Sequence, residues 1–328
     1  MTEQPQPIPV SPPRPALSGS SATASATAGV ERPRWSRQRP AQAAAIYSLC
    51  YLATGLIGNW LAARTTSDFA LWLIVLAVGV LSLAFALLLA LSVCRIDVRP
   101  GAEAAWMVGA VVVFALARPL VLAVLGRWLG LGELGGRLMR VLPDLPGQQL
   151  VGNIALILWA IFLGRLVSHV IREGKMLLPV AVVASIADVI TVFHGVVAKV
   201  TAQAPEVLQA FSATAPVAPP PGVTVPVLTA VGIGDFLFLA LFLTIALRYS
   251  MNAVQAMWGA FAAMLVAPFA FFIWPDAPGM PGLPFISVGV LAANWKHLQY
   301  SASERRALVI AGAVTAALTA AVWVVVRR

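Results

Sequence analysis

The chain has 328 residues, of which 60% are hydrophobic and only 11% are charged. Soluble domains average about 25% charged residues, so the composition excludes an ordinary soluble fold and indicates a polytopic helical membrane protein. The net charge of +9 comes from basic residues in the N-terminal tail and at the ends of apolar segments. That placement favours contact with anionic lipid over binding of nucleic acid, which we do not expect as a partner.

The first 40 residues are rich in proline, alanine and serine and end in a cluster of arginines. Such a segment cannot bury enough apolar surface to fold, so residues 1–40 are predicted to be a disordered, basic tail. The tail lacks the apolar core of a cleavable signal peptide. We therefore expect the first apolar segment to act as an uncleaved anchor.

Nine apolar segments follow the tail, and most are long enough to cross a bilayer as a helix. They cover residues 42–63, 69–94, 102–125, 149–171, 176–197, 223–247, 251–273, 281–297 and 307–326. The sequence therefore predicts an all-α bundle of about nine transmembrane helices, with residues 41–175 as a scaffold and 176–328 as the region that carries the motifs. The long loop at 198–222 includes Pro216-Val-Ala-Pro-Pro-Pro-Gly222, which is predicted to be a flexible, proline-rich connection.

Orientation is predicted from the distribution of Lys and Arg. These residues are in excess on the side of the bundle that holds the N-terminal tail. Because basic loops stay in the cytoplasm, we expect a cytoplasmic N-terminus in a multi-pass protein of the cell (inner or plasma) membrane.

Two acidic residues lie where stability alone does not explain them. Of the 13 acidic residues, only Asp188 and Asp235 fall deep within apolar segments. Burying an ionised carboxylate in a membrane is costly, so such residues are functional by default. The two segments are consecutive and antiparallel, and the carboxyl groups are therefore expected to face each other.

A pair of touching carboxyl groups has a characteristic chemistry. The two groups do not easily ionise together, so they share one proton. The ionised member can draw a proton from a water, and the neutral member can protonate a leaving nitrogen. This is hydrolysis of an amide by general acid–base catalysis, and it needs neither a metal nor a covalent intermediate.

Three motifs accompany the two aspartates, in the stretches 185–193, 232–238 and 281–287. Ser185-Ile-Ala-Asp-Val-Ile-Thr-Val-Phe193 resembles the aspartate helix of presenilins, and Gly232-Ile-Gly-Asp-Phe-Leu-Phe238 resembles the GxGD signature of presenilins and signal peptide peptidases. Pro281-Gly-Leu-Pro-Phe-Ile-Ser287 resembles the Pro-Ala-Leu-Pro stretch of the same family. The resemblance covers roughly residues 176–295.

The resemblance implies a GxGD-type intramembrane aspartic endopeptidase with a presenilin-like core in its C-terminal half. Such an enzyme cleaves transmembrane helices or leftover signal peptides, works without cofactor or metal, and has a transmembrane-helix substrate and the lipid bilayer as partners. Asp188 and Asp235 would be the catalytic pair. Residues that would shape the site or bind an unwound substrate are Gly232, Gly234, Pro281, Gly282, Leu283 and Pro284. Whether the chain forms an oligomer or needs an accessory subunit stays open.

The sequence departs from the family pattern at three points. Ala187 stands where presenilins have tyrosine before the aspartate, so whatever that hydroxyl does is lost or supplied elsewhere. Gly282 replaces alanine in the third motif, a change expected only to add flexibility. Four predicted spans precede the one with Asp188, where the family has five.

Other interpretations of the aspartates remain open at this stage. The pair could join two helices without further function, serve as a relay in a proton-coupled transporter, or belong to a catalytically inactive relative. A prepilin-type peptidase also has a Gly-x-Gly-Asp signature, but the basic residue usual after its aspartate is missing here. Arg118 and Arg165 also fall within predicted spans, where snorkelling or a displaced span boundary is favoured over pairing with a carboxylate.

Overall fold

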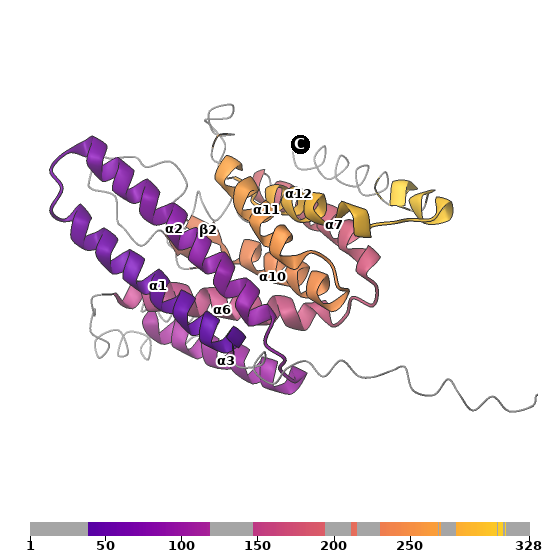
Figure 1. Cartoon of the computed structure of the whole chain (residues 1–328), viewed down its shortest axis with the longest axis horizontal. Coiled ribbons are helices and arrows are strands. Elements are labelled where there is room, and N and C mark those ends of the chain that lie inside the picture. The colour runs from indigo at the N-terminus through magenta and orange to yellow at the C-terminus, as the bar shows by residue number, and fades with distance from the viewer. Residues whose placement is uncertain are drawn as a thin grey trace, which may run out of the picture. The chain divides into compact units, whose positions relative to one another are not determined.

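The computed structural model describes residues 39–118, 147–193, 211–214, 230–267, 269, 280–306, 308–310 and 312, and 83% of these residues are helical. The helices of the first half are α1 (Arg39–Ala62), α2 (Asp68–Cys94), α3 (Pro100–Ala117) and α6 (Gln148–Ser168) (Figure 1). Those of the second half are α7 (Leu177–Phe193), α10 (Ile233–Arg248), α11 (Ala253–Val266) and α12 (Leu283–Asn294), with short 3-10 turns η2 (Gly174–Met176) and η4 (Trp295–His297).

Within the described ranges, five helical segments are long and apolar enough to cross a membrane: α1, α2, α3, α6, and α7 together with η2. They are compatible with an integral membrane protein. The helices α10, α11 and α12 are shorter, with 16, 14 and 12 residues. The ninth predicted segment, 307–326, lies almost wholly outside the described residues, and so do the ends of several others.

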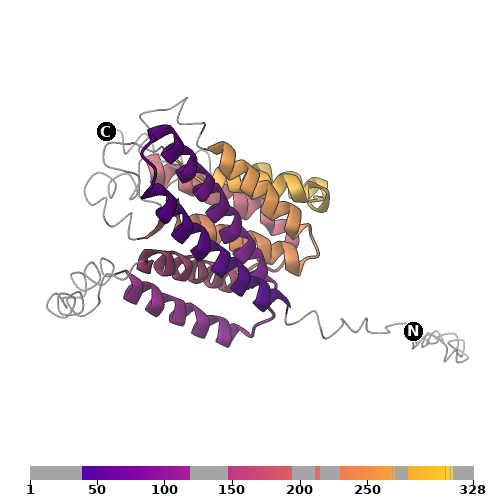
Figure 2. The same cartoon turned by 60° about the vertical axis from the view of Figure 1, so that its left-hand side comes forward.

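The helix α10 is the centre of the packing. It lies against α6 and also contacts α2, α7, α11 and α12 (Figures 1 and 2). Its side chains from Leu239 to Leu243 are all buried, as expected of a helix that is apolar on every side. The outer helices α1 and α3 keep large apolar side chains exposed, for example Leu56 and Trp106. Such side chains suit contact with lipid.

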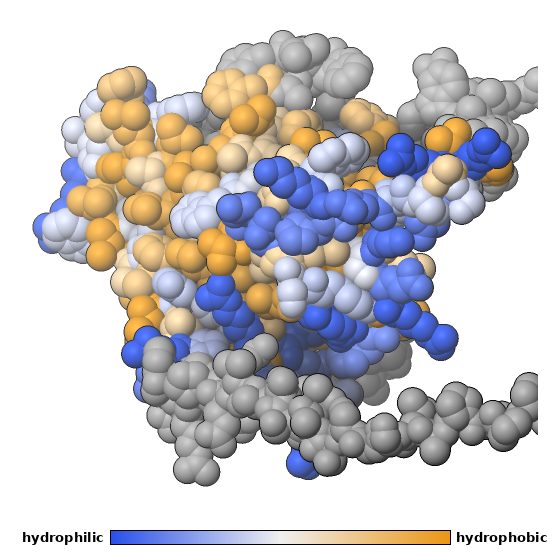
Figure 3. Space-filling model, turned by 45° about the vertical axis from the view of Figure 1, so that its right-hand side comes forward, coloured by the Kyte–Doolittle hydropathy of each residue, from blue (hydrophilic) through white to orange (hydrophobic). Residues whose placement is uncertain are grey.

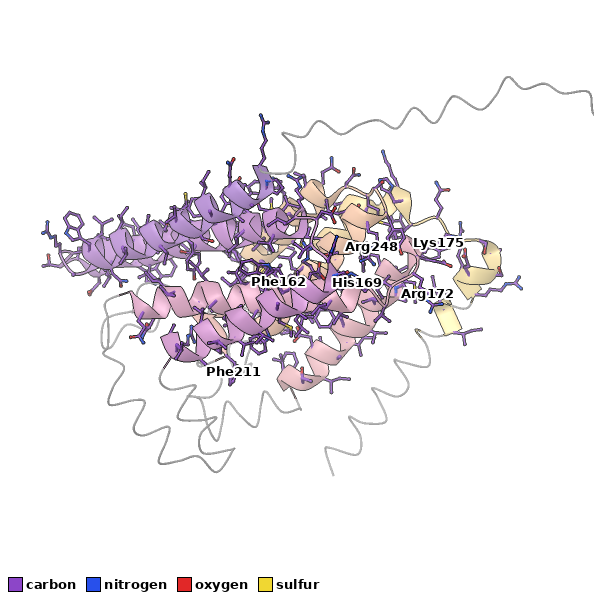
Figure 4. The ribbon with its side chains drawn as sticks, turned by 90° about the horizontal axis from the view of Figure 1, so that it is seen from below. Phe162, His169, Arg172, Lys175, Phe211 and Arg248 are labelled. Atoms are coloured by element: carbon purple, nitrogen blue, oxygen red, sulfur yellow. The ribbon has the colours of Figure 1, made fainter. Side chains whose placement is uncertain are left out.

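Several helix ends meet at one end of the bundle, where hydrogen bonds join them. Arg248 at the end of α10 donates to the carbonyl of Ser168 at 2.8 Å. Lys175 before α7 lies 3.0 Å from Glu304. Hydrophilic side chains gather on one face of the molecule in Figure 3. Figure 4 labels four basic residues at the end of the bundle where these helix ends meet: His169, Arg172, Lys175 and Arg248.

Arg165 forms a buried ion pair, so the expectation of snorkelling was wrong for this residue. Its Nη2 lies 2.5 Å from Oε1 of Glu103, and both side chains are almost fully buried. The guanidinium also donates to the carbonyls of Val93 and Ile96 at the end of α2. Sequence reasoning missed the pair because Glu103 stands on α3, and only the packing of α2, α3 and α6 brings it to Arg165.

Arg118 directly follows the last residue of α3, so the span boundary lies here within the described residues. Its guanidinium donates to Oδ1 of Asn153 on α6. The guanidinium also lies 5.7 Å from the ring centre of Phe114. Asn153 in turn donates to the hydroxyl of Tyr51 at 3.2 Å. This network joins α1, α3 and α6.

A small antiparallel sheet interrupts the helical pattern. Strand β1 (Ser212–Thr214) pairs with β2 (Ala230–Gly232), and Ser212 lies opposite Gly232. The prediction of a helix at 230–232 was therefore wrong, and the loop predicted at 198–222 contains a short strand. The proline-rich part of that loop, 216–222, lies outside the described residues. Hydropathy could not show the pairing, because it depends on two segments that are separated in sequence. The extended backbone of Gly232, with φ −65° and ψ 148°, ends β2 directly before α10.

Candidate active site

Asp188 lies in the C-terminal part of α7, on the side of that helix that faces α12. Its side chain is half-buried. The backbone N–H of Leu283, the first residue of α12, donates a hydrogen bond to Asp188 Oδ2 at 3.0 Å. The backbone N–H of Gly282 also donates to this carboxylate. The N-terminal N–H groups of a helix have no partner within the helix, and they carry the positive end of its dipole. Asp188 therefore serves as an acceptor at the start of α12.

Asp235 lies in the first turn of α10, immediately after strand β2. The change from strand to helix at Gly232 fixes where that turn begins. A Cβ built on Gly232 would lie 3.4 Å from Asp235 Oδ2, which is an ordinary contact distance. The backbone N–H of Gly232 donates a hydrogen bond to the carboxyl group of Asp235. The sheet thus positions Asp235 at the point where the chain enters the central helix.

The third motif joins the two aspartates. A Cβ added to Gly282 would lie 2.5 Å from Oδ1 and 2.9 Å from Oδ2 of Asp235, so the glycine backbone is packed directly against this carboxyl group. The next residue, Leu283, binds Asp188. The two carboxyl groups also interact electrostatically with each other. Two consecutive residues therefore contact both members of the pair.

This contact corrects the expectation for Gly282. An alanine there was expected to be a mild change, but its methyl group would overlap the carboxyl group of Asp235. The backbone of Gly282, with φ −80° and ψ −32°, is one that any residue adopts. Glycine is therefore needed here because a side chain would clash with Asp235, and not because the backbone dihedral angles require it.

The remaining residues of the predicted site are less closely involved. Pro281 is buried beside the contact, and Pro284 occupies the second position of α12, where a missing N–H costs nothing. Among the described residues, nothing lies within 4 Å of a Cβ built on Gly234, so the close packing predicted at this glycine is not found. Ala187 is exposed next to Asp188. Its methyl group carries no hydroxyl, so Ala187 itself does not replace the tyrosine of the resembled family.

Two serines near the carboxyl groups were not singled out by sequence reasoning. Ser185 on α7 and Ser287 on α12 have their hydroxyl oxygens 3.0 Å apart. Helical spacing could have suggested both serines, since Ser185 lies about one turn from Asp188 and Ser287 about one turn from Leu283.

No family model, curated protein or solved structure matches this chain.

Proposed function

We propose that this chain is an intramembrane aspartic endopeptidase of the GxGD type, with Asp188 and Asp235 as its catalytic pair. The supporting observation is that one dipeptide, Gly282-Leu283, contacts both carboxyl groups. Three motifs that are far apart in the sequence thus come together at one place. A pair that merely linked two helices would not need a backbone segment from a third helix on both of its members.

The hydrogen bonds divide the roles of the two carboxyl groups. Donated N–H groups stabilise a negative charge. Asp188 receives two of them, from Leu283 and Gly282 at the start of α12, whereas Asp235 receives one, from Gly232. Asp188 is therefore the ionised member and acts as the general base. Asp235 carries the shared proton and acts as the general acid.

The reaction follows from this division. Asp188 takes a proton from a water while the water oxygen bonds to the scissile carbonyl carbon, and Asp235 donates a hydrogen bond to the carbonyl oxygen. Asp235 then passes its proton to the amide nitrogen. The carbon–nitrogen bond breaks, which releases a carboxylic acid and an amine. The pair ends with one proton, now on Asp188, and its return to Asp235 resets the site.

The proposed substrate is a transmembrane helix or a leftover signal peptide. A helix satisfies its own backbone hydrogen bonds and must unwind locally before water reaches a scissile carbonyl. The exposed side of α7, with Val182, Val183 and Ala187, is open to such a substrate beside Asp188. The stretch 281–284 was expected to pair with the unwound segment as an extended strand, but Gly282 has helical dihedral angles and Leu283 and Pro284 begin α12. Its proposed role is therefore to shape the site beside the two carboxyl groups.

The finer arrangement in the membrane belongs to the same proposal. We take the chain to have about nine spans with a presenilin-like core, and the end of the bundle with Arg172, Lys175 and Arg248 to face the cytoplasm because basic loops are retained there. This would place the N-terminus in the cytoplasm as well.

The test is cleavage of a transmembrane reporter by the purified protein in liposomes. Asp188→Asn and Asp235→Asn should each abolish cleavage, while Asp97→Asn, which removes an exposed carboxylate in the connection between α2 and α3, should not. Persistent cleavage in both variants of the pair would refute the assignment. Proton flux that both substitutions abolish, without cleavage by the unaltered chain, would support the transporter instead.

A further inference from the structure

A network of hydroxyl groups links α7 to α12, about one helical turn from the hydrogen bond between Leu283 and Asp188. Ser185 Oγ donates to the carbonyl of Ala181 at 2.7 Å and lies 3.0 Å from Ser287 Oγ. Ser287 Oγ also reaches the Ala181 carbonyl, at 3.4 Å. Three polar atoms from two helices thus satisfy one another in an apolar interface.

The network and the catalytic contact lie on the same helix–helix interface. Ser185 precedes Asp188 by three residues, and Ser287 follows Leu283 by four. Each spacing is about one helical turn, or about 5 Å along the axis. The bond between Leu283 and Asp188 and the bond between the serines are therefore successive contacts of one antiparallel pair. A shift of α12 along α7 would break both.

The opposite side of α12 is fixed by a second close contact. A Cβ built on Gly259 of α11 would lie 2.5 Å from the carbonyl oxygen of Gly289 on α12. The two helices therefore touch backbone to backbone, as small residues allow. At the far end of α12, Asn294 Oδ1 accepts a hydrogen bond from the backbone N–H of Asn252, just before α11, at 2.8 Å. The polar contact that lies near the carboxyl groups is the one between the serines on the α7 side of α12.

We propose that Ser185 and Ser287 are positioning residues, which set the height of α12 on α7 so that the Leu283 N–H meets Asp188. This inference rests on the proposed protease function. Ser287 is almost fully buried and touches no reacting group, so it acts through the register of α12. Hydrogen bonds between spanning helices are individually weak, and the consequence is therefore expected in the rate rather than in the stability.

The experiment compares Ser185→Thr with Ser185→Val in the transmembrane-reporter assay. The two side chains have nearly the same shape, but only threonine keeps a hydroxyl, which can bond the carbonyl four residues earlier as Ser185 does. We expect Ser185→Thr to retain most of the activity. Ser185→Val should lower kcat by about 10- to 100-fold with little change in KM, since small misplacements of catalytic groups cost that much.

Three further variants complete the test. Ser287→Ala should show the same loss of kcat, and the double variant Ser185→Val with Ser287→Ala should be no worse than either alone, because the hydroxyls act as one unit. Ser48→Ala removes a hydroxyl that bonds only within α1 and should leave kcat unchanged. Equal kcat values for Ser185→Thr and Ser185→Val, or losses that multiply in the double variant, would overturn the positioning role while the protease assignment stands. An unaltered chain without cleavage would overturn both.

Discussion

The backbone N–H of Leu283 and the carboxylate of Asp188 form a hydrogen bond of 3.0 Å across 95 positions of sequence. This bond places the start of α12 against one aspartate, and the preceding residue is packed against the other. The pair of carboxyl groups is thereby connected to a third helix. The positions of the two carboxyl groups therefore depend on the backbone at the start of α12 as well as on the helices that carry the aspartates.

Gly282→Ala should abolish most of the cleavage activity. The added methyl group would overlap Asp235 Oδ1, at 2.5 Å, so either the carboxyl group or α12 must move. A displacement of about 1 Å at reacting groups can lower a rate by about 100-fold. The control is Gly109→Ala on α3, which meets nothing within 4 Å among the described residues and should leave the rate close to that of the unaltered chain. Full activity of Gly282→Ala would contradict the observed contact.

Loss of one member of the Glu103–Arg165 pair should destabilise the protein without touching the site. Arg165→Leu leaves the Glu103 carboxylate buried without its cation, which typically costs about 3–5 kcal/mol. We expect a much lower unfolding temperature in detergent. The double variant Arg165→Leu with Glu103→Leu should recover most of the loss, because no buried charge remains. If the single and double variants unfold at the same temperature, the pair does not contribute as described.

Gly259→Ala should separate α11 from α12. Its methyl group would lie 2.5 Å from the Gly289 carbonyl oxygen, and overpacking of this kind costs about 1–3 kcal/mol. Gly109→Ala on α3 is the control of opposite sign, since it meets nothing within 4 Å and alanine favours a helix over glycine by about 1 kcal/mol. Thermal unfolding of the two variants measures both effects. A destabilised Gly109→Ala variant would show that the contact at Gly259 is not the cause.

The carboxyl group of Glu304 should titrate at unusually low pH. The backbone N–H of Ser301 donates to it and Lys175 pairs with it, and together they lower the pKa of Glu304 from 4.5 to about 2. A lowered pKa means that the contact stabilises the fold above pH 4.5, and that this contribution is lost as the pH falls through about 2. The carboxyl resonance of Glu304 measured by NMR gives the midpoint. A midpoint near 4.5 would exclude the contact in solution, and added salt should weaken it.

Hydropathy located the helices because backbone groups in a bilayer must bond within their own segment. The predicted segment 69–94 agrees with α2 to within one residue at its start, and 149–171 contains nearly all of α6. The same rule misplaced the start of α10. There the apolar run continues through β2, whose hydrogen-bond partners come from β1 rather than from the next turn.

The aspartates and the third motif were accessible to sequence reasoning because each carries a local signal. A carboxylate within an apolar run and a proline-glycine stretch at the start of another are visible without a structure. The fit of Gly282 against Asp235 was not, because it is a contact between distant segments. The pairing of Ser185 with Ser287 escaped for the same reason, since a serine within an apolar helix has no partner until the neighbouring helix is placed.

The two carboxyl groups stand on helices of very different surroundings. The helix α10 is enclosed by α2, α6, α11 and α12, whereas α7 packs chiefly on α12 and leaves Val182, Val183 and Val189 exposed. Asp235 is therefore anchored to the centre of the bundle, and Asp188 to its periphery. A movement of α7 would shift Asp188 against Leu283, while Asp235 on α10 stays at the centre of the bundle. Lipid or a bound helix that presses on the outer face of α7 would thus change the spacing of the pair from one side only.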